Sequence, residues 1–133
     1  MIEQLNLHGR YPSADSIYYQ SFYKAGVLLE VYGKFDKATE AYLQACVHAP
    51  DEARKLKMDV FAGAGYYDQN NFDSANYFLL KADENPGILQ SEDQVRLYNT
   101  LGVLYYDNGN YLQGKNYFSQ ALRILQEKNP ADR

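Results

Sequence analysis

The sequence predicts an all-α domain made of three stacked helix-turn-helix hairpins. Three observations support this prediction. The same residue types return at intervals of 37 and 39 residues, and helix start and stop signals flank the segments between them. The composition is that of an ordinary globular chain: of the 133 residues, 46% are hydrophobic and 23% charged. This length suffices for one domain with a buried core.

The repeat is anchored by a glycine that follows Ala or Leu three times, at Gly26, Gly63 and Gly102. Four further columns match when they are counted from each glycine. They hold a residue suited to left-handed backbone, an aromatic residue, a small residue and an alanine. In that order the columns are Gly33, Asn70 and Gly109; Phe35, Phe72 and Tyr111; Ala38, Ala75 and Gly114; and Ala45, Ala82 and Ala121.

Each column has a physical reason. Glycine inside a helix costs about 1 kcal/mol relative to alanine, so a repeated helical glycine indicates that a second helix approaches closely. The two columns of small residues then supply the matching face of that second helix. Gly and Asn end helices in the left-handed conformation, so we expect a helix to end at each of Gly33, Asn70 and Gly109. We expect the aromatic column to plug the turn between the two helices.

The helices follow in order from these signals. Ser13 opens the first helix, and Pro50-Asp51 separates the first hairpin from the second. Asn85-Pro86-Gly87 ends the second hairpin, Ser91 with Gln94 forms a capping-box pattern, and Asn129-Pro130 ends the third. We therefore expect helices at 13–32 and 36–48, at 52–68 and 73–85, and at 92–107 and 111–127.

These columns resemble the tetratricopeptide repeat (TPR), a motif of roughly 34 residues. The Leu-Gly pair of that motif corresponds to the three glycine pairs, and the aromatic position on its second helix corresponds to Tyr42, Leu79 and Phe118. Asp59 departs from the motif's first large position, which Phe22 and Tyr98 occupy. Aligned in this way, the repeats are about 19–52, 56–89 and 95–128. They lie within a domain of 13–128 that has an N-terminal extension, 1–12, and a C-terminal tail, 129–133.

The resemblance implies a right-handed superhelical stack of three antiparallel hairpins. In such a stack the first helix of each hairpin lines a concave groove, and the second helix forms the convex wall. A stripe at i, i+3, i+7 and i+10 on the first helices should face the groove. We expect the partner-contacting residues to be Tyr23, Val27, Lys57, Val60, Ala64, Tyr67, Arg96, Asn99, Val103 and Tyr106, with Gln20 and Glu30 completing the stripe.

The tyrosines of this stripe have two interpretations. A tyrosine on a repeat helix often packs between neighbouring units, but tyrosine is also a typical interface anchor. In the pairs Tyr66-Tyr67 and Tyr105-Tyr106 the two side chains point about 100° apart, so only one of each pair can face the second helix squarely. We expect the other to lie nearer the groove.

The predicted function is a protein–protein interaction module, a scaffold or adaptor that binds a peptide or a partner protein in the groove. The alternative is a regulatory or sensory segment of a larger bacterial signalling protein, because the linkers resemble those of repeats that precede effector domains. Some TPR domains hold chaperone carboxylates with a cationic and amide set. Of the corresponding residues only Arg96 matches, so we do not expect that clamp; the positions are Tyr23, Val27, Phe61, Arg96 and Thr100.

Other function classes find little support in the sequence. His8 and His48 have no companion at metal-ligand spacing, and Cys46 has no partner cysteine and no signal of a base beside it. We therefore predict no enzyme, no catalytic residue, no metal and no cofactor. The net charge of −4 without a basic run argues against nucleic acid, and no apolar stretch approaches the roughly 18 residues of a membrane span. A single cysteine fits a reducing compartment, so we expect a cytoplasmic protein.

The ends of the array suggest one further expectation. Repeat stacks usually finish in a polar cap, yet the last predicted helix carries more apolar side chains than its own hairpin can cover: Tyr117, Phe118, Leu122, Ile124 and Leu125. Residues 1–12 resemble the end of an earlier helix. We therefore expect either a piece cut from a longer array or self-association through the exposed repeat ends.

Overall fold

The computed structural model describes residues 13–128, which form six α-helices and one short 3-10 helix. Each α-helix lies within a few residues of its predicted range. Their bounds are α2 (Ala14–Val31), α3 (Phe35–Val47), α4 (Glu52–Asp68), α5 (Phe72–Ala82), η1 (Pro86–Ile88), α6 (Ser91–Asp107) and α7 (Tyr111–Lys128).

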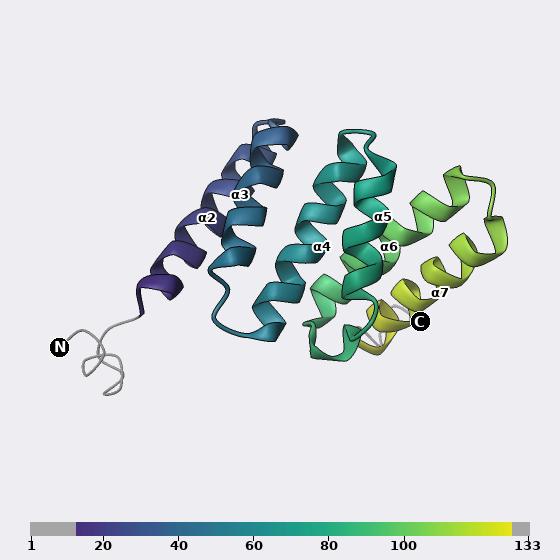
Figure 1. Ribbon diagram of the computed structural model, residues 1–133. Coiled ribbons are helices and arrows are strands. Elements are labelled where there is room, and N and C mark those ends of the chain that lie inside the picture. The colour runs from purple at the N-terminus through teal and green to yellow at the C-terminus, as the bar shows by residue number, and fades with distance from the viewer. Residues whose placement is uncertain (1–12, 129–133) are drawn as a thin grey trace.

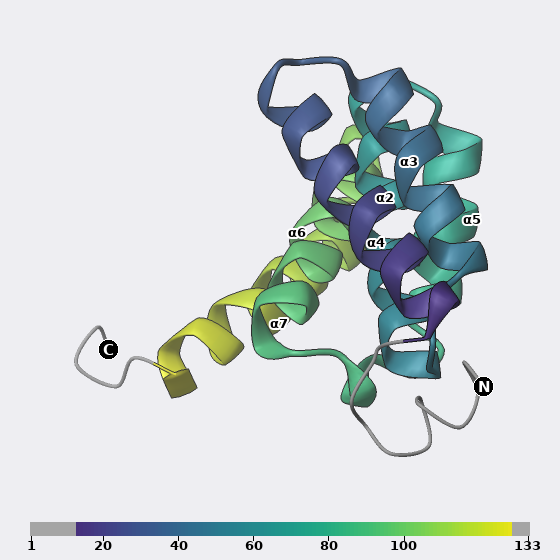
Figure 2. The same cartoon turned by 90° about the vertical axis from the view of Figure 1, so that its left-hand side faces the viewer.

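The helices pack as three antiparallel hairpins, α2 with α3, α4 with α5 and α6 with α7. Figure 1 shows the hairpins side by side in chain order. Between hairpins, α4 packs against α3, and α6 packs against both α4 and α5. Seen along the stack in Figure 2, the third hairpin lies at an angle to the first two. The predicted fold class, an all-α stack of three hairpins, is therefore confirmed.

The first helix of each hairpin ends in the same way. Gly33, Asn70 and Gly109 have φ angles of 75°, 62° and 87°, which places all three in the left-handed region as predicted. The N–H that follows each of them bonds to a carbonyl five residues back, at 2.9 Å in every case. The N–H groups of Gly33, Asn70 and Gly109 themselves bond to the carbonyls three residues back, at 2.9, 2.9 and 3.1 Å. The two bonds together form the Schellman motif, which satisfies carbonyls that the helix end would otherwise leave without a partner.

The repeated glycines mark the helix crossing inside each hairpin. A Cβ atom built on Gly26 would lie 2.5 Å from the ring of Tyr42. Built on Gly63 it would lie 2.7 Å from Leu79, and built on Gly102 it would lie 2.6 Å from Phe118. The same pair of columns therefore meets in all three hairpins. The small residues on the second helices are all buried: Ala38, Ala75 and Gly114, and Ala45, Ala82 and Ala121.

The structure corrects three details of the sequence prediction. The aromatic column does not plug the turns, since Phe72 and Tyr111 are 39% and 60% exposed. The Ser91–Gln94 capping box does not form, because Gln90 is the N-cap and makes no side-chain cap bond. Gln94 instead donates to the carbonyls of Pro86 and Leu89, at 2.9 and 3.3 Å.

The third corrected detail is the end of α5, which stops at Ala82 and not at Asn85. The residue before a proline disfavours helical backbone, so Pro86 restrains Asn85. The chain leaves the helix through i→i−3 bonds from Glu84 to Lys81 and from Asn85 to Ala82. The short helix η1 then carries it to α6.

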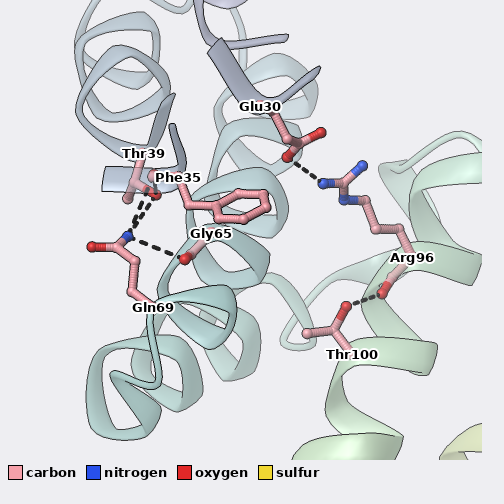
Figure 3. Close-up of polar contacts among 7 residues, drawn as sticks. All are labelled: Glu30, Phe35, Thr39, Gly65, Gln69, Arg96 and Thr100. Carbon is pink, nitrogen blue, oxygen red and sulfur yellow. Dashed lines mark hydrogen bonds and ion pairs between the residues drawn. The ribbon is translucent and has the colours of Figure 1, made fainter. Parts of the chain in front are cut away.

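Two buried features distinguish the contact of the first two hairpins. Thr39 of α3 touches Gly65 of α4 so closely that no Cβ fits there. The Gln69 amide joins Thr39 Oγ1 and the Gly65 carbonyl, at 3.0 and 3.1 Å (Figure 3). Asp59 is also buried here, and its Oδ2 has no hydrogen-bond partner among the described residues.

Candidate interaction groove

The predicted stripe residues differ in how far they are exposed. Asn99, Val27 and Tyr106 are exposed, whereas Tyr23, Lys57, Tyr67, Arg96 and Val103 are half-buried. Val60 and Ala64 lie in the core, at 0% and 7% exposure. The reason is the central position of α4, which packs against α3, α5 and α6 and so has its stripe covered from several sides. Val60 therefore offers no surface to a partner in this arrangement.

Five of the predicted residues nevertheless come together in one cleft between α4 and α6. This cleft, called the Tyr67 cleft below, has a volume of about 330 Å³. Its predicted lining residues are Ala64, Tyr67, Arg96, Asn99 and Val103, and sequence reasoning missed two others, Asp68 and Thr100. Each of the two follows a predicted residue directly in the sequence: Asp68 follows Tyr67 on α4, and Thr100 follows Asn99 on α6.

Aromatic pairs extend from this cleft toward the turns. Tyr67 packs on Phe72, and Tyr106 packs edge-on against Tyr111, with ring centroids 5.7 and 4.8 Å apart. The preceding tyrosines point the other way, since Tyr66 stacks on Phe78 of α5 and Tyr105 stacks on Tyr117 of α7. In each pair the first ring therefore stacks within the second helix, whereas the other ring contacts that helix only at its first residue, Phe72 or Tyr111.

An ion pair that the sequence did not predict links the first and third hairpins across this face. Arg96 Nη2 of α6 donates to Glu30 Oε1 of α2 at 2.8 Å, as Figure 3 shows. The Arg96 guanidinium also lies 4.4 Å from the centroid of the Phe61 ring. Both side chains were placed in the stripe, but no repeating column indicates that they meet.

Two side chains that line the Tyr67 cleft, Asp68 and Tyr67, have raised pKa values. Burial raises the pKa of Asp68, and Glu30 adds to this effect while Arg96 opposes it. Burial also raises the pKa of Tyr67, whose hydroxyl donates to Asp107 Oδ2 at 2.9 Å. Polar donors and aromatic rings thus border one another here, as they do in surfaces that bind peptides.

A second cleft lies where α4 and α6 begin. It has a volume of about 450 Å³ and is called the Asp93 cleft below. Three residues of the predicted stripe, Gln20, Tyr23 and Lys57, line it together with Asp93. Lys57 Nζ lies 4.8 Å from the centroid of the Tyr23 ring, a cation–π distance. The predicted stripe is thus divided between two clefts, and Val27 and Tyr106 line neither of them.

His48 and Cys46, which were considered for metal binding or catalysis, lie among packed side chains. His48 ends α3 and lies 2.9 Å from Asp15 Oδ1, beside the rings of Tyr18 and Phe22. Cys46 is half-buried, and burial raises the pKa of its thiol to about 11, so the thiol is protonated at neutral pH. Within residues 13–128 no group of three or more His, Cys, Asp or Glu side chains could hold a metal ion. His8 lies outside the described residues.

The exposed end of the stack carries the apolar residues that the sequence indicated. Leu122 and Leu125 of α7 are exposed, whereas Tyr117 is buried. Val95, Ile124 and Leu125 line an end cleft of about 380 Å³. No helix among the described residues is long and apolar enough to cross a membrane.

No model of a known protein family matches the sequence. No curated protein matches it either.

Proposed function

We propose that the three hairpins are tetratricopeptide-type repeats, and that the chain is an interaction module that binds a peptide segment of a partner protein in the Tyr67 cleft. The single observation that carries the proposal is the convergence in that cleft of five stripe residues, which the repeat resemblance and helical spacing had selected from the sequence. Three equivalent glycine crossings and three equivalent helix ends support the repeat assignment.

The chemistry of the cleft suits an extended peptide. Asn99 offers an exposed amide that can bond to a peptide backbone, and Val103 and Tyr67 offer half-buried apolar surface. The exposed rings of Tyr106 and Tyr111 continue this surface toward the turn. Tyrosine contributes large contact area at low entropy cost, and it is enriched among the residues that dominate binding energy.

Site-specific photo-crosslinking tests this proposal. A photoreactive phenylalanine analogue at Asn99 places the probe in the cleft, and the same analogue at Tyr77, an exposed position on α5, is the matched control. We expect the probe at Asn99 to crosslink a specific protein in native lysate and the probe at Tyr77 not to do so. A Tyr67→Ala/Tyr106→Ala variant with unchanged helix content should weaken that crosslink at least about tenfold. Equal crosslinking from both positions would contradict the proposal.

A further inference from the structure

The Asp93 cleft holds two charged side chains whose hydrogen-bonding capacity is unused. The side chains of Asp93 and Lys57 are 9% and 24% exposed. Asp93 Oδ2 and Lys57 Nζ lie 4.0 Å apart, which is too long for a hydrogen bond. Neither side chain forms a hydrogen bond to another of the residues 13–128. Buried charges are normally both paired and hydrogen-bonded, so this pair is incomplete.

The other charges of the cleft are already satisfied. Asp51 accepts from the backbone N–H of Arg54 at 2.8 Å and from the Arg54 guanidinium at 2.5 Å. Lys57 and Asp93 therefore remain as one cation and one anion without a hydrogen bond, the Lys57 ammonium lying over the rings of Tyr23 and Phe61. A ligand with a single charge would form an ion pair with one of the two side chains and would be repelled by the other. A ligand that carries both charges close together would satisfy both.

Apolar surface and a helix end surround this pair. The rings of Tyr19 and Tyr23 and the exposed side chain of Ile88 line the same cleft. The N-terminus of α6 also opens here, and its N-cap residue, Gln90, makes no side-chain bond to it. The first N–H groups of a helix attract a carboxylate, so the positive side of the cleft extends beyond Lys57.

We propose that the Asp93 cleft binds a free α-amino acid with an apolar side chain. The ligand ammonium donates to Asp93, and the ligand carboxylate accepts from Lys57 beside the first turn of α6. The apolar side chain lies against Tyr23 and Ile88. The volume of about 450 Å³ accommodates such a molecule. This site is separate from the Tyr67 cleft and does not depend on a protein partner.

Titration calorimetry with L-leucine and two of its derivatives tests the proposal. We expect L-leucine to bind, and both N-acetyl-L-leucine and L-leucine amide to bind at least about tenfold more weakly, because each lacks one of the two charges. Absence of L-leucine binding, together with absence of binding by the other apolar amino acids at millimolar concentration, would overturn the proposal. Equal affinity for L-leucine and its amide would also overturn it, since a simple ammonium site would then suffice.

Two variants and two controls locate the binding. Asp93→Asn and Lys57→Met should each weaken L-leucine binding at least about tenfold while the helix content is unchanged. Lys55→Met on the same helix and Asp73→Asn on α5 remove exposed charges outside the cleft and should leave the affinity unchanged. Unchanged binding in both cleft variants would place the ligand elsewhere and refute the assignment. Asn99→Ala in the Tyr67 cleft should not alter L-leucine binding, so this site can fail or hold independently of the proposed partner groove.

Discussion

Gly65 of the second hairpin lies in close contact with Thr39 of the first. A Cβ there would overlap Thr39 Oγ1, which cannot move freely because it donates to the Phe35 carbonyl at 2.7 Å and accepts from Gln69. Alanine is the better helix former by about 1 kcal/mol, but overpacking a well-packed contact costs about 1–3 kcal/mol. We therefore expect Gly65→Ala to lower the free energy of unfolding, measured by urea denaturation.

A second substitution separates steric overlap from other causes. Thr39→Ala removes the hydroxyl that the new methyl group would strike. The Gly65→Ala/Thr39→Ala variant should therefore be more stable than Gly65→Ala alone, even though Thr39→Ala also removes two hydrogen bonds. If the second substitution lowers stability further, the overlap at Gly65 is not the cause.

The buried carboxyl of Asp59 should make the stability of the protein depend on pH. Burial raises the pKa of its carboxyl, and it outweighs the opposing effects of Lys81, the Cys46 thiol and Lys55; Glu52 acts in the same direction as burial. An acid whose pKa is raised on folding stabilises the native state below its unfolded pKa of about 3.9. That contribution is lost as the pH rises through the folded-state pKa. Above the unfolded pKa the buried carboxyl of Asp59 therefore costs stability.

Asp59→Asn removes this cost with little change of shape. We expect the variant to exceed the wild type in free energy of unfolding by on the order of 1 kcal/mol at about pH 7.5, and by less at about pH 4.5. Urea unfolding of both proteins at the two pH values measures the difference. A gain that is the same at both pH values would mean that the ionisation of Asp59 is not responsible.

At the scale of the helix, the three left-handed residues determine where the first helix of each hairpin stops. The space around Gly33 and Gly109 is open, so a side chain there meets no neighbour, and the only penalty is that of the backbone conformation. An L-residue in this region costs about 1–2 kcal/mol. We expect Gly33→Ala and Gly109→Ala each to destabilise the protein by that amount, measured by thermal unfolding.

Gly87 in η1 is the matched control for these variants. It also has open space around it, but its φ lies outside the left-handed region. Gly87→Ala should therefore change stability little. A similar loss in all three variants would point to a general effect of alanine and not to the helix ends.

Helix ends and hairpin pairing could be predicted from the sequence because their signals recur. A column such as Gly26, Gly63 and Gly102 appears in every unit, and each member meets the same column of the second helix. Contacts between units are different in kind. The Thr39–Gly65 contact occurs once, so no repeated column marks it. Asp59 is marked only as a departure from a column of large residues, which does not indicate that its carboxyl is buried. Val60 illustrates the limit, since its spacing places it in the stripe while the packing of α4 buries it.

At the scale of the whole molecule, the Glu30–Arg96 ion pair connects the two outer hairpins. The side chains are 24% and 33% exposed, so solvent screens this pair less than a surface pair. Nε of Arg96 is buried without a partner among the described residues, and the stacking on Phe61 holds the guanidinium in place. Loss of the pair should therefore loosen the first hairpin relative to the third.

A double-mutant cycle measures this connection. We expect Glu30→Gln and Arg96→Met to be coupled by about 0.5–3 kcal/mol in free energy of unfolding, because the two groups touch and are partly desolvated. The Glu92–Lys128 pair joins the two helices of a single hairpin at an exposed site, and the cycle of Glu92→Gln with Lys128→Met should show no measurable coupling. Raising the salt concentration should leave the Glu30–Arg96 coupling largely intact. Strict additivity of Glu30→Gln and Arg96→Met would mean that the outer hairpins are held only through the middle one, by the packing of α4 against α3 and α6.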